Sequence, residues 1–276
     1  MKKCICFFIL FLLTAVSAAF ATDQKTVAEE QIKKKAAPLE QPAKEKLFLS
    51  TDYDYGWVHL GSQTGSWTVF TNTVAYEMNK FFTPYLEQNV LGRFGHIDYS
   101  TNVGSYLKFQ DSSYIHSEIG FGENITYIYN FQATLEYVHK LIDKCFWLAG
   151  SKYLNYRAGS DVYIVYPGLI YYFGDSYITA FYDNSFTEGR GMAKWGSVKG
   201  NFALTDRLSA WLGAAYGQRM YDIELLPSSQ QYGYIAFCGL NYKITEWLSA
   251  KSGFSYSREK PDFIKRSLEA GLTCKF

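Results

Sequence analysis

The sequence of 276 residues has little charge and few long hydrophobic runs. Charged residues make up 19% of it and the formal net charge is +1, which excludes a basic surface for holding nucleic acid. From Leu47 to Phe276 no stretch of 18 apolar residues occurs, which excludes a bundle of membrane-spanning helices. Aromatic residues nevertheless reach 18% while the mean hydropathy is only −0.15. A disordered chain would not carry so many aromatics, so the composition favours either a large β-sandwich or a β-barrel in a membrane.

Cysteine is also scarce. Of the five cysteines, only Cys145, Cys238 and Cys274 lie beyond the N-terminal apolar run. An odd number without C-x-x-C spacing predicts neither a disulfide framework nor a zinc site, so we interpret all three as hydrophobic fillers. We expect no metal and no cofactor, because neither a metal-ligating cluster nor a phosphate-binding glycine loop occurs in the sequence.

The N-terminus resembles a secretory signal peptide. Lys2 and Lys3 precede an apolar run, and the run ends in the small-residue site at 19–21, so residues 1–21 are predicted to be removed. A membrane anchor is the alternative, but the run is shorter than the ~20 residues that a spanning helix needs. Residues 22–46 lack aromatics and are predicted to be a flexible periplasmic segment, with a pore plug or a docking segment as alternatives.

Residues 47–276 alternate apolar and polar side chains with a period of two. In the last segment Leu268 and Leu272 fall on one face, and Ser267 and Glu269 fall on the other. The pattern predicts about fourteen strands, or twelve if 84–109 is one long strand. The expected ranges are 48–60, 66–78, 84–98, 102–109, 112–122, 127–139, 145–157, 161–173, 175–187, 191–203, 206–218, 230–243, 246–257 and 264–276.

The connections between these strands differ on the two sides. Those after even-numbered strands are tight and polar, whereas those after odd-numbered strands vary, and the longest runs from Met220 to Ser229. Short turns on one rim and longer loops on the other are typical of a barrel in the bacterial outer membrane, as are strands longer than those of soluble sheets. The sequence therefore predicts an all-β protein, a transmembrane antiparallel β-barrel after a signal peptide and a flexible segment.

Aromatic residues gather toward the predicted strand ends, where rings with polar tips are stable at the lipid boundary. These residues are Tyr53, Tyr55, Trp57, Tyr171, Tyr172, Trp247 and Tyr256. The chain ends on Phe276, on the face assigned to lipid. A terminal aromatic in an alternating strand resembles the signal that barrel assembly machinery reads, so we expect that machinery, outer-membrane lipid and lipopolysaccharide as partners. Cys238 and Cys274 fall on strands two apart, ~10 Å from each other, and are predicted to remain thiols.

A barrel of fourteen strands has an interior too wide for its own side chains to fill. Many inward positions of the later strands are small or polar, which leaves room for water and solute. Rings on the wall offer flat apolar faces on which sugars stack, and the candidate contacts to a solute or glycan are Trp195, Lys199, Trp211, Arg219 and Lys251.

Several segments resemble the YaiO-type outer-membrane barrel family. They are 91–95 (LGRFG) with Asp98, 150–154 (GSKYL), 166–174 (YPGLIYYFG), 177–182 and 213–217 (GAAYG). This family is similar to the C-terminal barrel of the subunit that exports bacterial cellulose. The resemblance implies a channel or export component for exopolysaccharide or other small hydrophilic solutes.

Two other functions stay open: a lipid-modifying hydrolase, and a structural or adhesive surface barrel. An enzyme is not expected, because neighbours in a strand alternate, so His116 and Glu118 share a face that Ser117 does not. His96 and Asp98 share a face and are close enough in sequence to hydrogen-bond, but no nucleophile lies beside them.

Overall fold

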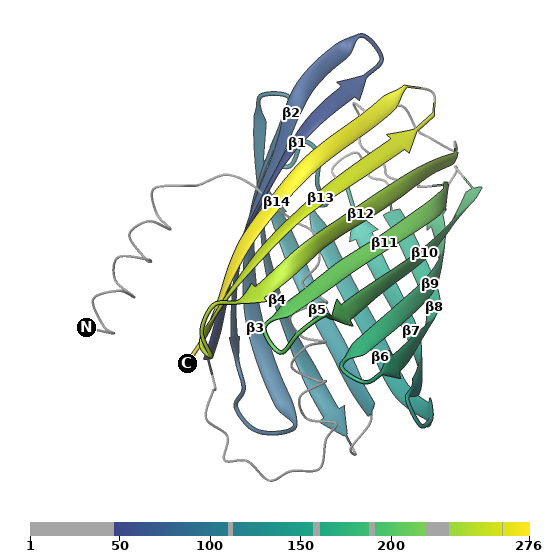
Figure 1. Ribbon diagram of the computed structural model, residues 1–276. Coiled ribbons are helices and arrows are strands. Elements are labelled where there is room, and N and C mark those ends of the chain that lie inside the picture. Colours follow the sequence, from purple (N-terminus) through teal and green to yellow (C-terminus); the bar gives the residue numbers. More distant parts are fainter. Residues whose placement is uncertain (1–46, 110–112, 157–160, 188–190, 219–231, 261) are drawn as a thin grey trace.

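The computed structural model describes residues 47–109, 113–156, 161–187, 191–218, 232–260 and 262–276. Fourteen antiparallel strands form one closed barrel, which confirms the predicted fold and strand number (Figure 1). In this part of the chain no helix is long and apolar enough to cross a membrane. The strands are β1 (Leu47–Leu60), β2 (Gln63–Tyr76), β3 (Phe82–Arg93), β4 (His96–Phe109), β5 (Ser113–Glu123), β6 (Phe131–Ile142), β7 (Cys145–Asn155), β8 (Asp161–Phe173), β9 (Ser176–Thr187), β10 (Gly191–Ala203), β11 (Leu208–Gln218), β12 (Tyr232–Lys243), β13 (Leu248–Glu259) and β14 (Phe263–Lys275).

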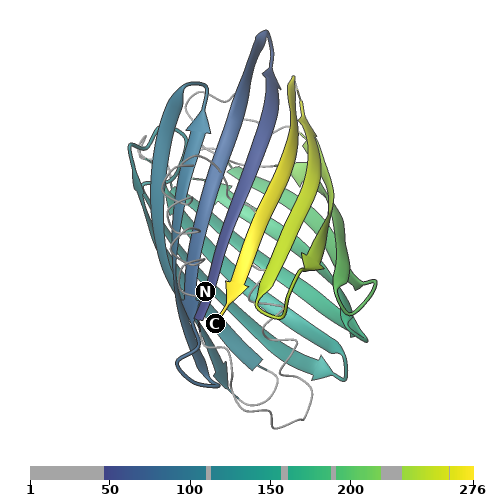
Figure 2. The ribbon, with the colours of Figure 1, turned by 60° about the vertical axis from the view of Figure 1, so that its left-hand side comes forward.

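Each strand pairs with its neighbours in sequence, and β1 closes the barrel against β14. The two strands lie side by side in Figure 2, and their pairing runs from Phe48 opposite Lys275 to Leu60 opposite Phe263. Closure leaves no strand edge with unpaired N–H and C=O groups, which is what a sheet needs to cross a membrane.

The segment 84–109 contains two strands. The expected range 84–98 was wrong at its end, because the chain reverses at Phe94 and Gly95. Both residues have positive φ, 48° and 85°, the backbone that a two-residue hairpin turn requires. This reversal decides the strand count in favour of fourteen.

The strand expected at 127–139 begins later, at Phe131, so its predicted start was wrong. Residues 124–130 form a loop that starts at Asn124, whose φ is 53°. The buried carboxylate of Asp98 accepts the backbone N–H groups of Thr126 and Tyr127, and these donors are therefore not available to a strand ladder.

The two rims differ as predicted. On the rim that holds both barrel ends (Figure 1), two to five residues of sequence separate consecutive strands, whereas thirteen residues separate Gln218 at the end of β11 from Tyr232 at the start of β12. The same hydrogen bond stabilises two of the tight turns. The hydroxyl oxygens of Thr205 and Thr245 accept hydrogen bonds from the backbone N–H groups of Leu208 and Leu248, each at 3.0 Å.

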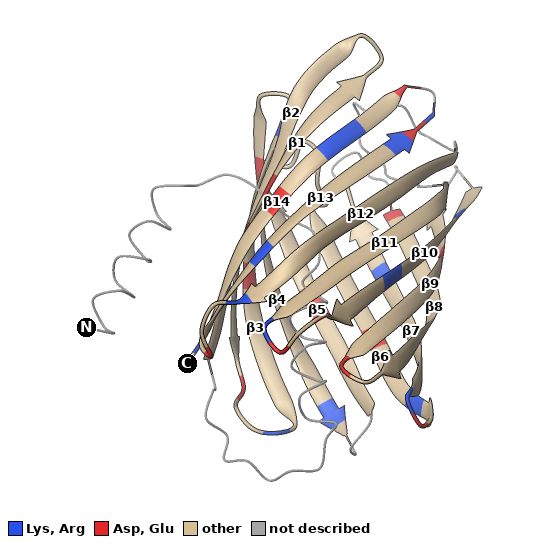
Figure 3. Cartoon of the chain, in the orientation of Figure 1, with Lys and Arg blue, Asp and Glu red and all other residues tan. Residues whose placement is uncertain are grey.

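The alternation of faces is also as predicted. Leu212 and Leu272 are about half exposed on the outer wall, whereas Trp211 and Ser267 are buried on the inner one. Figure 3 shows that most of the strand ribbon carries no charged residue. Cys145, Cys238 and Cys274 are free thiols, as expected.

One residue of the proposed aromatic girdle does not belong to the outer wall. Tyr172 points inward and packs with the inner cluster that includes Tyr177, at 5.7 Å between ring centroids. Its neighbour Tyr171 is 52% exposed on the outer wall, so only one of two consecutive tyrosines can face lipid.

Candidate functional site in the lumen

The inner wall between β1 and β9 borders a cavity of about 490 Å³. Its charged lining is mainly acidic: the carboxylates are Asp52, Glu87, Glu118 and Asp183, and the lysine is Lys152. These residues come from five different strands, and each lies at an inward position of its strand. The cavity is therefore a polar part of the lumen, with more negative than positive side chains around it.

A buried hydrogen-bond network fixes the wall around Glu87. One carboxylate oxygen, Oε1, accepts from the amide groups of Asn89 at 2.5 Å and Asn102 at 2.8 Å. The Thr71 hydroxyl in turn donates to Asn89 Oδ1 at 2.6 Å. Because each polar group is held by another, the wall presents a fixed pattern of donors and acceptors to the lumen.

On the same wall, Tyr85 connects Glu118 to a stack of rings. Its hydroxyl donates to Glu118 Oε2 at 2.5 Å and lies 2.7 Å from His116 Nε2. The His116 ring is stacked on Tyr106, with 4.6 Å between centroids and 16° between planes. Ser117 lies on the opposite face, where its hydroxyl contacts that of Ser105 at 3.1 Å. As predicted, residues 116–118 do not form a catalytic triad among themselves.

The loop 124–130 folds back against the inner wall. Besides the two bonds to Asp98, Arg93 Nη1 donates to the carbonyl oxygen of Tyr127 at 3.1 Å, and the Tyr129 hydroxyl donates to Asn102 Oδ1 at 2.7 Å. Burial raises the pKa of Tyr129 above its usual range, so its hydroxyl remains a donor. Tyr129 lines the cavity, and the loop therefore narrows the lumen there. The sequence allowed a hydrogen bond between Asp98 and His96, but in the described residues the Asp98 carboxylate anchors this loop.

Glycines opposite inward aromatic residues let the rings lie along the wall. Tyr85 is paired with Gly104 and Tyr166 with Gly150. A Cβ atom added at these glycines would lie 2.3 and 2.2 Å from the tyrosine rings, so any other residue type there would force the ring to move. Because the rings cover the backbone of the next strand, they leave the centre of the lumen less filled.

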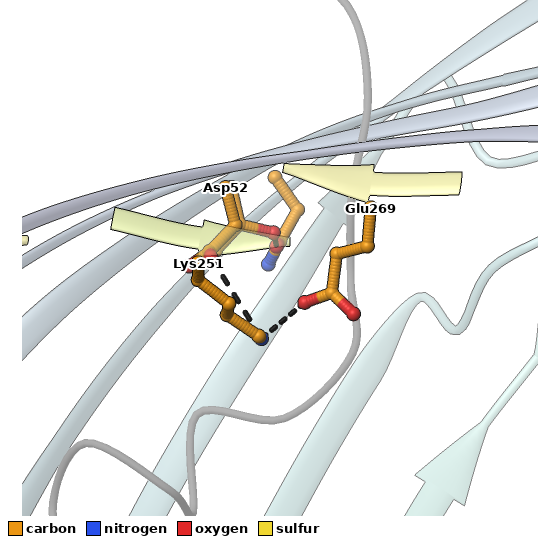
Figure 4. Close-up of polar contacts among 5 residues, drawn as sticks. Asp52, Lys251 and Glu269 are labelled. Atoms are coloured by element: carbon orange, nitrogen blue, oxygen red, sulfur yellow. Dashed lines mark hydrogen bonds and ion pairs between the residues drawn. The ribbon is translucent and has the colours of Figure 1, made fainter. Parts of the chain in front are cut away.

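Two of the predicted contact residues come together on the inner wall near the closure of β1 with β14. Trp211 covers Gly239 and Gly253, and the Lys251 ammonium nitrogen lies 5.5 Å from a ring centroid of Trp211. Lys251 also forms an ion pair with Glu269 and lies 3.8 Å from Asp52 Oδ1 (Figure 4). This lysine therefore links β13 to β14 and β1, the two strands whose pairing closes the barrel.

The other predicted contacts are less closely grouped. Trp195 and Lys199 lie at inward positions of β10, opposite Gly217 and Gly213 of β11. Arg219 lies outside the described residues. The prediction missed the polar wall altogether, although the alternation of Tyr85, Glu87 and Asn89 in one strand was a visible signal for it.

Comparison with known proteins places this barrel among those of the outer membrane. The sequence matches the YaiO membrane beta barrel domain over residues 49–189, and no curated protein matches it. Among solved structures, a bacterial polysaccharide outer membrane secretin is 10% identical, with a TM-score of 0.61 over 85% of this chain and 100% of that one. The CymD monoaromatic hydrocarbon channel is 8% identical, with a TM-score of 0.64 over 95% of each chain. An outer membrane protein of Acinetobacter baumannii is 12% identical, with a TM-score of 0.53 over 85% of this chain and 100% of that one.

Proposed function

Because the chain belongs to the YaiO membrane β-barrel family, we propose that it is a channel or export component through which exopolysaccharide or another small hydrophilic solute crosses the outer membrane. The observation that carries this proposal is the polar wall of the lumen cavity. Carboxylates, amides and phenols in fixed positions offer hydrogen bonds to sugar hydroxyls, and inward rings offer flat surfaces to their C–H faces.

The polarity of the cavity favours a hydrophilic solute over a hydrocarbon. The barrels that share this fold include a polysaccharide secretin and a hydrocarbon channel, so the fold alone does not separate these solutes. A hydrocarbon would displace water from this polar wall without making hydrogen bonds to it, whereas a hydrated glycan passes the wall with its own hydroxyls and water.

We propose no catalytic step for this barrel. The placement of Ser117 on the outer wall, opposite to His116 and Glu118, supports a passive role. Phe276 follows β14 and exchanges backbone hydrogen bonds with Leu47 at 2.9 and 3.2 Å, which is consistent with its proposed role as part of the signal for the assembly machinery.

Planar-bilayer recording on the purified mature chain tests the proposal. We expect resolvable single-channel conductance that neutral gluco-oligosaccharides block, and weaker block by the same sugars in Trp211→Ala. The matched control is Trp57→Ala, since Trp57 is a tryptophan of the outer wall with 51% exposure. A barrel that inserts but conducts nothing would refute the channel proposal. Unchanged block in Trp211→Ala would refute only the contact assigned to this ring.

A further inference from the structure

The outer wall carries a continuous row of polar side chains over β1–β4. Thr51 is paired with Asn72, Asn72 with Gln88, and Gln88 with Thr101, so the four residues occupy one level of four adjacent strands. The row ends where Thr51 meets Leu272 of β14 and Thr101 meets Phe121 of β5. We call these four residues the polar row.

The polar row lies within the apolar belt of the barrel. The next outward positions toward one rim are Tyr53, Phe70, Val90 and Tyr99, and those toward the other rim are Leu49, Val74, Leu86 and Val103. Apolar side chains on both sides place the row at a depth where the wall meets hydrocarbon. Polar groups at this depth are costly unless another polar group covers them.

The adjoining wall over β11–β14 has no comparable row at mid-strand in the described residues. At mid-strand the outward positions of β11, β12 and β14 are Ala210, Leu212, Ala214, Ala236, Cys238, Leu240, Leu268, Ala270 and Leu272. In β13 a single hydroxyl, Ser252, lies between Ala250 and Phe254. The outer wall of this chain can therefore be apolar at mid-strand, as it is in β11, β12 and β14.

Hydrogen bonds within the barrel satisfy only part of the row. The Thr51 hydroxyl donates to Asn72 Oδ1 at 2.8 Å, which leaves the amide N–H groups of Asn72 pointing outward. Among the described residues the Gln88 amide and the Thr101 hydroxyl have no hydrogen-bond partner, and Gln88 is exposed. Donors and acceptors therefore remain available on a face turned toward lipid.

We propose that the polar row is the contact between two copies of this chain in the membrane. The row is uncharged, and amides and hydroxyls both donate and accept, so the surface is complementary to itself. A two-fold axis along the membrane normal that passes between Asn72 and Gln88 brings each of them close to the other residue on the second copy. The amides then pair across the interface, as polar side chains do between membrane-spanning segments.

Cysteine cross-linking in the outer membrane tests the interface. In a variant in which Cys145, Cys238 and Cys274 are replaced by alanine, Asn72→Cys is expected to give a disulfide-linked dimer on mild oxidation. The matched control is Ser252→Cys, a polar outward position of β13, which lies outside the polar row and is expected to give none. Equal cross-linking at both positions, a product with the mass of a different protein, or no cross-link although the thiol is modified by a maleimide would overturn the proposal.

Mass measurement of the purified chain in detergent is the second readout. We expect the mass of two copies for the unaltered chain and of one copy for the double variant Asn72→Leu with Gln88→Leu. Both replacements are apolar and suit a lipid-facing wall, so the variant barrel is expected to fold, and heat-modifiable migration on a gel checks this. A single copy in the unaltered chain, in detergent and in the membrane, or a dimer that persists in the double variant, would contradict the assignment.

Discussion

The anchoring of the loop 124–130 by Asp98 predicts that this residue controls access to the lumen. The Asp98 side chain is 1% exposed, and its two oxygens accept the N–H groups of Thr126 and Tyr127 at 2.9 and 2.7 Å. In Asp98→Asn the shape is kept, but the charge is lost and an amide N–H group faces one of the two backbone donors. Hydrogen bonds to charged groups contribute about 1.5–3 kcal/mol each, so we expect the free energy of loop opening to fall by about 2–4 kcal/mol.

Hydrogen exchange measures this loss directly. The amides of Thr126 and Tyr127 are expected to exchange roughly 30- to 1,000-fold faster in Asp98→Asn, because exchange follows the population of the open loop. Single-channel recordings should show more frequent opening transitions over the same range of voltage. The control is Glu123→Gln, which neutralises an exposed carboxylate at the end of β5 beside the same loop. Unchanged exchange in Asp98→Asn, or equal acceleration in Glu123→Gln, would refute the argument.

Three further predictions concern the lumen wall. Gly104→Ala places a methyl group 2.3 Å from the Tyr85 ring and is expected to destabilise the barrel by about 1–3 kcal/mol. The control is Gly196→Ala, which is expected to have no such effect because the nearest atom to its added methyl group is 4.0 Å away. Thermal unfolding in detergent compares the two variants. Lys251→Met removes one cation from beside Glu269 and Asp52 and is expected to cost roughly 1–3 kcal/mol, less than in a dry core because lumen water screens the charges. No change in the same unfolding assay would show that these ion pairs do not contribute to stability. The acidic cavity predicts a preference for K⁺ over Cl⁻ in the reversal potential under a KCl gradient, and a preference for Cl⁻ would contradict it.

The fold was predictable because apolar and polar side chains alternate along most of the strands. A period of two fixes which residues face lipid, so the faces of β11 and β14 could be assigned from sequence. Strand ends were less predictable where the chain departs from local preference. Phe94 adopts a positive φ in a hairpin turn, and Tyr127 is held in a loop by a carboxylate 29 residues away in sequence. Neither condition is visible in a window of neighbouring residues.

The candidate site was only partly predictable, for a related reason. Inward orientation follows from alternation, and on that basis Trp211 and Lys251 were chosen from the later strands. Which inward residues touch each other depends on register, and register between strands is set by the whole closed barrel. The pairing of Glu87 with Asn102, and of Tyr85 with Glu118, crosses one and two strand boundaries.

The same register explains how a chain rich in aromatics keeps an open interior. Inward rings that projected across the lumen would fill it, since a ring reaches far from its own strand. Tyr85, Tyr166 and Trp211 instead each lie over a glycine of the neighbouring strand. A glycine at that cross-strand position is therefore as much a part of the wall as the ring it supports, and a search for similar barrels should look for the pair. The aromatic excess that first marked the sequence then has two separate causes: lipid-facing rings on the outer wall, and rings supported by glycine on the inner one.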